Sequence, residues 1–372
     1  MKKLNITLGI SVIIIGNLFS QSLTNTGQLL QGGIDDGVKM VNAYILPLNR
    51  AMSVGLNNSN FNTLYNGDGK RFSLSFNTSL ISIPTEDQTF DVNQLGLENI
   101  AAQPGNSIAQ TVFGSNDSIP LYSRDSIPDT SFIPGGGNGG GLPFKSINNV
   151  DSVSIFSFSS ITGSDIHLLP LAYLSFTYKF NFGNLSAEVL PYYSSETTVI
   201  SWGINWQQNL SMFIPNLKDK PFTISSTIGY YSFYLRNQLD VQPDDVTVPY
   251  TLTGDAIGPY DNQELKMNFS SIYLSFQSTY TIKKFTFWGT LAYNYGFSNI
   301  KVLGRYPIYG SDPTGTASVS LTDIDDPMDE SDHYSRFKAA IGTRFDISRY
   351  YIQANYTIAS YGGLGIALGI RF

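Results

Sequence analysis

The sequence has 372 residues, no cysteine and a formal net charge of −7. The chain is therefore neither an acylated lipoprotein nor a disulfide-stapled secreted domain, and an acidic chain without basic clusters argues against nucleic acid as a partner. Only 14% of the residues are charged, against about 25% in a usual soluble domain, and 13% are aromatic, which suits a barrel whose outer band faces lipid between aromatic girdles.

Residues 1–21 have the pattern of a signal peptide. A charged start at Lys2 and Lys3 precedes an apolar stretch to Ile15 and a small, polar exit, and the apolar stretch is too short to span a membrane. We predict export with cleavage near Ser20–Gln21, which leaves 20 basic and 29 acidic residues, a net charge of −9. No later apolar run approaches the roughly 18 residues of a spanning helix, so a membrane form of this chain has to be a closed barrel.

A short helix is predicted within residues 22–66. Asp35 and Asp36 can cap it, and apolar residues then recur at helical spacing as far as Pro47, namely Ile34, Val38, Val41 and Ile45. Because an apolar stripe on a helix needs a partner surface, two placements are open. The helix either packs on the periplasmic base of the barrel or inserts into the lumen as a plug.

The barrel is predicted over residues 67–372. Its first strand runs from Arg71 to Ile83, where apolar and polar residues alternate until Pro84. The pattern then weakens. Gln103 to Pro143 is rich in Gly, Pro, Ser and Asp and includes a glycine run at 135–141, which favours a surface loop over a phosphate-binding loop. Val150 to Ile161 is a less regular candidate strand.

Nine further strands are predicted between about His167 and Phe372, and the connections between them alternate in length. The short turns are Gly183-Asn184, Ile214–Pro221, Lys283-Lys284 and Ser348-Arg349. The long, acidic connections on the opposite side are Arg236–Glu264 and Lys301–His333. Short periplasmic turns with long external loops are typical of outer-membrane barrels. The direction of the first strand requires an even number of strands in 84–166, which gives 10, 12 or 14 in total, and we favour 12 or 14.

The last strand, Gly363 to Phe372, has one continuous apolar face. Leu364, Ile366, Leu368, Ile370 and Phe372 alternate with small residues and Arg371, and about ten residues suffice to cross a hydrocarbon layer at the tilt of a barrel strand. A terminal Phe372 behind Ile370 and Leu368 resembles the assembly signal of bacterial outer-membrane β-barrels. This resemblance implies the barrel assembly machinery and outer-membrane lipid as partners.

The same alternation points seven charged or aromatic side chains into the lumen, among many small polar residues. They are Lys179, Glu188, Trp288, Lys338, Arg344, Asp346 and Arg371. They form either an ion-paired interior that packs and hydrates itself or the lining of a permeation path or ligand pocket. A register shift by one residue would exchange every inward and outward assignment.

No enzymatic, metal or cofactor site is predicted. His167 and His333 are the only histidines, and no recognisable nucleophile motif accompanies them, although serines lie near His167. The acidic segment from Asp323 to Asp332 lacks the central Gly and terminal Glu of a helix–loop–helix calcium site, and Pro327 interrupts it. A solvated acidic surface is therefore favoured there over a divalent-cation site.

Two stretches carry a family resemblance. The first is Val41 to Thr63, continuing through Thr89-Phe-Asp91. The second comprises Leu169-Pro-Leu-Ala-Tyr173, Leu190-Pro-Tyr192, Trp202 to Gln208 and Phe213 to Phe222. Together they resemble an uncharacterised outer-membrane barrel family common in Bacteroidota-type bacteria, which is loosely similar to the long-chain fatty-acid transporters. That similarity implies 14 strands and an N-terminal hatch, and it supplies no catalytic residues.

The leading hypothesis is an integral barrel in the outer membrane of a Gram-negative cell that binds or passes a small, hydrophobic molecule. The apolar N-terminal helix and the transporter resemblance motivate it. The alternative is a non-transporting barrel that docks envelope or secretion partners through its long acidic loops. A lipid-modifying enzyme that uses His167 is a third hypothesis, and a soluble secreted β-sandwich is the structural alternative.

Overall fold

The computed structural model describes residues 29–30, 33–56, 58, 61–64, 69–124, 126–128, 152–154, 157–193, 197–217, 220–243, 252–253, 256–311 and 319–372. The predicted signal peptide and the glycine run at 135–141 lie outside these residues. No helix within the described ranges combines the length and the hydropathy needed to cross a membrane.

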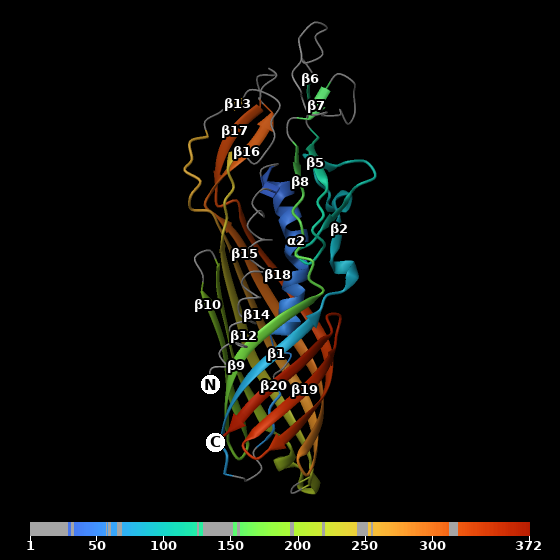
Figure 1. The fold of residues 1–372 in the computed structure, drawn as a ribbon, viewed down its shortest axis with the longest axis vertical. Helices are drawn as coiled ribbons and strands as arrows, with labels where there is room; N and C mark the ends of the chain where they lie inside the picture. The colour runs from blue at the N-terminus through green and yellow to red at the C-terminus, as the bar shows by residue number, and fades with distance from the viewer. Residues whose placement is uncertain are drawn as a thin grey trace.

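Ten antiparallel strands form a closed barrel (Figure 1). Their order is β1, β20, β19, β18, β15, β14, β12, β11, β10 and β9, and β9 pairs back to β1. Their bounds are β1 (Phe72–Ser82), β9 (Leu168–Lys179), β10 (Gly183–Tyr193), β11 (Thr197–Asn209), β12 (Phe222–Gln238), β14 (Glu264–Ile282), β15 (Phe285–Leu303), β18 (Met328–Ile347), β19 (Tyr350–Ile358) and β20 (Gly363–Arg371). The architecture is a closed barrel and not a β-sandwich.

The barrel wall is apolar outside and polar inside. Large apolar side chains stand exposed on every strand of the wall, including Phe72, Phe176, Val189, Ile204, Ile228, Phe276, Leu291, Ile341, Tyr356 and Leu368. The residues between them point inward and are buried, among them Ser75, Thr177, Ser186, Asn205, Thr227, Gln277, Thr290 and Asn355. An exposed apolar band of this extent is suited to lipid, and the ten strands close around it. The pairing of β9 with β10 runs from Lys179 and Asn184 to Leu174 and Val189.

The favoured count of 12 or 14 strands is wrong, as is the 14-strand expectation from the transporter resemblance. In the described part of residues 84–166 no strand joins the wall. The segment forms short external pairs instead: β2 (Thr89–Asp91) with β4 (Ile108–Gln110), β3 (Ile100–Ala102) with β5 (Pro120–Ser123), β5 with β8 (Ser157–Ser159), and β6 (Ser126–Pro128) with β7 (Ser152–Ser154). The candidate strand Val150 to Ile161 is thus two three-residue strands, too short to cross a membrane.

Short turns gather at one end of the barrel, here called the turn end, and the other is the loop end. Lys283-Lys284 and Ser348-Arg349 turn the chain where predicted. The Gly183-Asn184 turn is misplaced: β9 ends at Lys179, and the N–H of Phe180 donates to the carbonyl of Gly183 at 2.7 Å. The rings of Phe180 and Phe182 pack together at this turn, with their centroids 5.5 Å apart. The strand therefore ends before Phe180, although the alternation of apolar residues in the sequence continues to Phe182.

The two predicted long connections are shorter than expected because their strands extend beyond the apolar band. β12 continues to Gln238, β15 to Leu303, and β18 begins at Met328. Beyond β15 the chain forms a hairpin of β16 (Arg305–Ser311) and β17 (Val319–Asp325), and β13 (Leu252–Thr253) pairs with β17 in parallel. Figure 1 shows this side of the wall rising well above β1, β19 and β20.

Helix α2 (Ile34–Gly55) stands inside the upper part of the barrel (Figure 1). It contacts β15, β14, β18 and β1, so of the two placements that the sequence leaves open, the base and the lumen, the helix takes the one in the lumen. It also continues through Pro47 for two further turns, because its last residues are buried against the wall. The packing energy there offsets the hydrogen bond that a proline removes from a helix.

The inward side chains facing α2 are apolar, unlike those nearer the turn end. The helix contributes Met40, Val41, Tyr44, Ile45, Leu48, Met52 and Val54, and the wall contributes Val199, Tyr231, Phe233, Leu235, Leu265, Met267 and Phe269. All of these side chains are 2% exposed or less. The upper lumen is therefore filled by a hydrophobic core.

Candidate functional site

The segment after α2 descends through the polar part of the lumen. The ring of Phe61 stacks on Trp288 of β15, with centroids 4.1 Å apart and planes 7° from parallel. Six hydrogen bonds join this segment to four other strands. β1 and β19 contribute one each, Asn58 Nδ2 to Ser79 Oγ at 2.7 Å and Asn355 Nδ2 to Asn58 O at 3.0 Å. β9 and β10 contribute two each: Lys179 Nζ to Thr63 Oγ1 at 2.9 Å, Thr177 Oγ1 to Asn62 Oδ1 at 3.2 Å, Asn62 Nδ2 to Ser186 Oγ at 3.0 Å and Asn184 Nδ2 to Thr63 O at 3.2 Å. We call α2, Asn58 and residues 61–64 together the plug.

The helix is held at both ends by polar contacts. Near its start, the buried carboxylate of Asp36 accepts the backbone N–H groups of Glu98, Asn99 and Ile100 at 2.9, 2.6 and 2.9 Å. The capping role predicted for Asp36 is therefore wrong: Gly33 precedes the helix without a side-chain cap. Near its end, Asn294 Nδ2 donates to the carbonyl of Ser53 at 3.0 Å.

Gly296 of β15 lets the wall approach the helix. A Cβ added at Gly296 would lie 2.5 Å from Ser53 Oγ and 3.0 Å from Ser53 Cβ, closer than such atoms pack. Glycine is therefore required at this position by contact, and the helix and the wall share a fixed spacing here.

The lumen-facing residues proposed from the sequence all point inward, but they do not form one cluster. Lys179 and Trp288 hold the plug. Lys338 lies over the ring of Tyr273 at 4.9 Å, and Glu188 is buried with no hydrogen-bond partner for Oε1. The other three lie at the turn end, where Asp346 Oδ1 is 3.0 Å from Arg344 and 3.1 Å from Arg371. Their role as ligand residues stays a prediction.

The last residues complete the barrel seam. The backbones of Phe372 and Phe72 exchange hydrogen bonds of 2.8 and 3.2 Å, the Phe372 ring is 59% exposed, Leu368 is exposed and Ile370 is half-buried. The exposed ring of Phe372 at the seam is accessible to another protein, and the assembly role of these three C-terminal residues stays a prediction.

The histidines lie outside the lumen. His167 is exposed, and its Nδ1 is 2.9 Å from Nε2 of Gln88. His333 is on the outward face of β18, with its ring 6.0 Å from that of Tyr295. In the part of the chain that the structure describes, no group of three or more His, Asp or Glu side chains is arranged to hold a metal ion.

An external carboxylate clips the loop before β14 onto β17. Asp323 accepts the N–H of Ile257 at 2.8 Å, the N–H of Gly258 at 3.1 Å and the hydroxyl of Tyr260 at 2.6 Å. Partial burial raises the pKa of Asp323, but these hydrogen bonds and the charge of Arg305 outweigh it and hold the pKa below its usual value.

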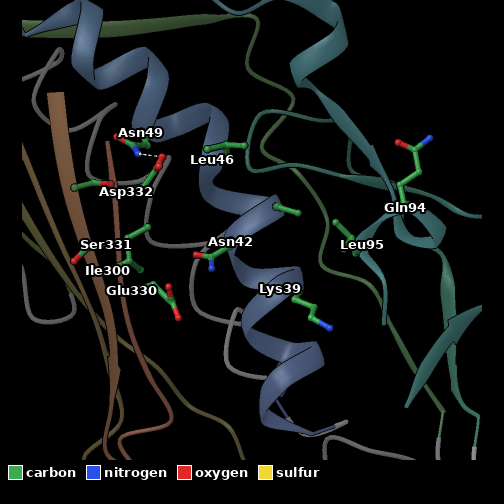
Figure 2. Close-up of a pocket in the computed structure, with 12 residues that line it drawn as sticks. Lys39, Asn42, Leu46, Asn49, Gln94, Leu95, Ile300, Glu330, Ser331 and Asp332 are labelled. Atoms are coloured by element: carbon green, nitrogen blue, oxygen red, sulfur yellow. Dashed lines mark hydrogen bonds between the residues drawn. The ribbon is translucent and has the colours of Figure 1, made fainter. Parts of the chain in front are cut away.

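A cavity of about 540 Å³ opens at the loop end, between the plug and the wall (Figure 2). It is lined from α2 by Lys39, Asn42, Ala43, Leu46 and Asn49, from the 3₁₀ turn η3 (Val92–Leu95) by Gln94 and Leu95, and from β15 and β18 by Ser298, Ile300, Glu330, Ser331 and Asp332. Figure 2 shows Asn49 hydrogen-bonded to Asp332 across it, at 2.9 Å. We call this the outer cavity.

The outer cavity was not predicted from the sequence. Glu330 and Asp332 were assigned to a solvated loop, although their spacing places both on the inward face once β18 begins at Met328. The residues that α2 contributes to the cavity do not indicate a binding site in the sequence, because Lys, Asn and Leu on one face of a helix are also typical of a solvent-exposed helix face.

A second cavity, of about 810 Å³, lies at the turn end. Thr63 and Leu64 of the plug line it together with wall residues that include Lys220, Lys283 and Arg371. Beside the plug, the space among Asn58, Tyr273, Trp288, Thr290, Lys338, Ala340 and Thr357 measures only about 10 Å³, about the lower limit for a single water molecule. The plug therefore lies between two vestibules.

Comparison with known proteins places the chain in a family without assigning an activity. No curated protein sequence matches it. Among solved structures, it is similar to the outer membrane protease OmpT of Escherichia coli (8% identity, 83% of this chain and 99% of that one, TM-score 0.30). It is also similar to the translocator domain of the autotransporter NalP of Neisseria meningitidis (11%, 89% and 96%, 0.28) and to the toluene transporter TbuX of Ralstonia pickettii (11%, 82% and 90%, 0.19).

At these TM-scores the structural similarities carry no argument, and the assignment as a membrane barrel rests on the closed strand ladder and the apolar outer band of this chain. A family model matches residues 1–372, the whole length of the chain. The protein belongs to that family, DUF6588, a family of unknown function.

Proposed function

We propose that this protein is exported to the outer membrane of a Gram-negative cell, where it binds a small molecule with an apolar body in the outer cavity and admits it through the lumen when the plug moves. The observation that carries the proposal is the position of the plug between two vestibules. By the rule of short periplasmic turns, the loop end faces outward and the turn end faces the periplasm. No enzymatic activity is part of the proposal.

The contacts of the lower segment of the plug, residues 58 and 61–64, suit a movable element. Its hydrogen bonds to the wall are mostly between neutral groups, each worth about 0.5–1.5 kcal/mol net because water can replace it. The strands behind them are joined around the whole barrel by backbone pairing, although β9 and β10 pair only from Lys179 and Asn184 to Leu174 and Val189. A displacement of the plug therefore leaves the wall intact.

A disulfide lock tests whether plug movement admits a ligand. The chain has no cysteine. The double variant Asn58→Cys with Ser79→Cys therefore introduces a single pair of cysteines, one on the plug and one on the wall. The probe is N-phenylnaphthylamine, a small hydrophobic dye that fluoresces after it passes the outer leaflet of intact cells. We expect cells with the native barrel to take up the dye faster than cells without it, and the locked pair to abolish the difference until it is reduced.

The matched control is Thr281→Cys with Thr286→Cys. These two side chains are 3.2 Å apart on the neighbouring wall strands β14 and β15, and oxidation there joins elements that are already paired. Dye entry that is equally fast in the oxidised plug-locked variant would contradict the proposal.

A second candidate function is docking of an envelope partner through the external hairpin of β16 and β17. It is favoured by the structured sheet at the loop end and by Ile257, which is 85% exposed beside it. Deletion of residues 305–325 leaves two ends that already lie together, because Gly304 and Asp326 are hydrogen-bonded to each other at 2.9 and 2.8 Å. It also removes the contacts of Asp323 with Ile257, Gly258 and Tyr260. Loss of a co-purifying envelope protein on this deletion, with dye entry unchanged, would favour docking over transport.

A further inference from the structure

The outer cavity contains buried polar atoms that lack partners. Asn49 is 2% exposed, and its Nδ2 donates to Asp332 Oδ2, which fixes the amide so that Oδ1 is directed elsewhere. Among the described residues this Oδ1 has no hydrogen-bond partner, and neither has Oγ of Ser298, which is 4% exposed. Buried polar groups are nearly always satisfied, so a ligand that presents hydrogen-bond donors fits here.

The charges of the residues that line the cavity favour a ligand with a positive charge. Glu330 and Asp332 project from β18 into the cavity, and Lys39 is the one cation among the lining residues. Its Nζ is engaged elsewhere, 2.8 Å from the carbonyl of Gly96 and 3.9 Å from Asp36. The lining thus offers two carboxylates, an amide oxygen and a hydroxyl, which favours a cation and disfavours a carboxylate ligand.

The remaining lining combines the neutral polar residues Asn42, Gln94 and Ser331 with four apolar side chains, and this apolar part distinguishes an organic cation from a metal ion. Ala43, Leu46, Leu95 and Ile300 come from three different elements. The volume of about 540 Å³ falls in the range of sites for small organic molecules and is far larger than a metal site. A protonated amine on an apolar body would satisfy both sides of the cavity.

We infer that the outer cavity binds an amphiphilic cation, with its ammonium group against Glu330, Asp332, Asn49 Oδ1 and Ser298 Oγ and its apolar body against Leu46 and Ile300. This deepens the proposed function by naming the class of its ligand. It departs from the fatty acids that the transporter resemblance suggests, because a fatty-acid carboxylate would meet two like charges.

Three indole compounds of similar shape and different charge test the inference by calorimetric titration of the purified protein. They are tryptamine (cationic), tryptophol (neutral) and indole-3-propionate (anionic). We expect tryptamine to bind about tenfold more tightly than tryptophol, and indole-3-propionate to bind most weakly. Glu330→Gln should lower the affinity for tryptamine about fivefold and leave that for tryptophol within about twofold, with Asp332→Asn acting in the same direction.

Glu330→Gln is the decisive variant, because Glu330, unlike Asp332, makes no side-chain hydrogen bond to the plug in the structure. Glu86→Gln, at an exposed acid outside the cavity, is the matched control and should change nothing. Equal affinities for the three compounds, no saturable binding by any of them, or a tryptamine affinity unaffected by Glu330→Gln would overturn the inference. The disulfide-lock assay is read separately, so that failure of plug-controlled entry is distinguishable from failure of this charge assignment.

Discussion

Replacing Asp36 by asparagine should release the external segment at residues 98–100 from the plug. The carboxylate of Asp36 is fully buried and accepts three backbone N–H groups, of which that of Ile100 is itself buried. Hydrogen bonds to a charged group contribute about 1.5–3 kcal/mol each. Because they share one acceptor group and asparagine keeps one carbonyl oxygen, we expect a combined local loss of about 3–5 kcal/mol.

Hydrogen–deuterium exchange of the peptide that covers residues 98–100 measures this loss directly. A local destabilisation of about 3 kcal/mol corresponds to exchange about 100-fold faster, since each 1.4 kcal/mol is a factor of ten. Asp35→Asn is the matched control, because Asp35 is exposed on the neighbouring position, and it should leave the rate unchanged. Equal rates in Asp36→Asn and the native protein would refute the assignment of Asp36 as the tether between plug and external segment.

Three further predictions concern the plug and the loops. Phe61→Ala removes the ring stacked on Trp288, at a local cost of about 3 kcal/mol, and should produce brief openings in single-channel recordings. The control Phe287→Ala, at a lipid-facing ring, should produce none. Silent channels in both variants would contradict the role of the stack. Gly296→Ala forces the wall against the helix and should also raise the frequency of channel openings. The control is Gly289→Ala, which should behave as native because a Cβ added there meets no atom closer than 3.9 Å. Identical opening frequencies in the two variants would count against a fixed spacing between helix and wall. The pKa of Asp323 in the folded protein is depressed by hydrogen bonds that outweigh its burial. The ionised carboxylate therefore stabilises the loop at residues 257–260 above about pH 4, and this stabilisation is lost as the pH falls through the depressed pKa of the folded state. Hydrogen exchange in residues 257–260 should accelerate at that pH, and Asp323→Asn should remove the pH dependence.

The barrel wall was predictable because one face of each strand meets lipid and the other meets small polar residues. Leu364 to Phe372 shows this alternation without interruption, and its register against β1 and β19 follows the predicted faces. The strand count failed where this constraint ends. The described part of residues 84–166 lies beyond the apolar band. Its short strands, such as β3 and β5, are stabilised by contacts with the plug and with each other, which leave no two-residue period in the sequence.

The luminal site was predictable only in part, for a related reason. Inward positions near the turn end are polar, and Lys179 and Arg344 stood out there. Higher in the lumen, both faces of a strand are apolar, as in Phe233-Tyr-Leu235, because one face meets α2 instead of water. This loss of alternation is the signal that a helix fills the barrel, and read in that way it favours the plug over a helix on the base.

Single-channel recording in a planar bilayer tests the central claim that the plug closes the lumen. The mature protein should show no steady conductance, and a variant lacking residues 29–64 should conduct steadily, because the wall pairs without the plug. Steady conductance of the same size in both proteins would mean that the plug does not close the barrel, and silence in both would mean that no continuous path lies behind it. Either result would contradict the account.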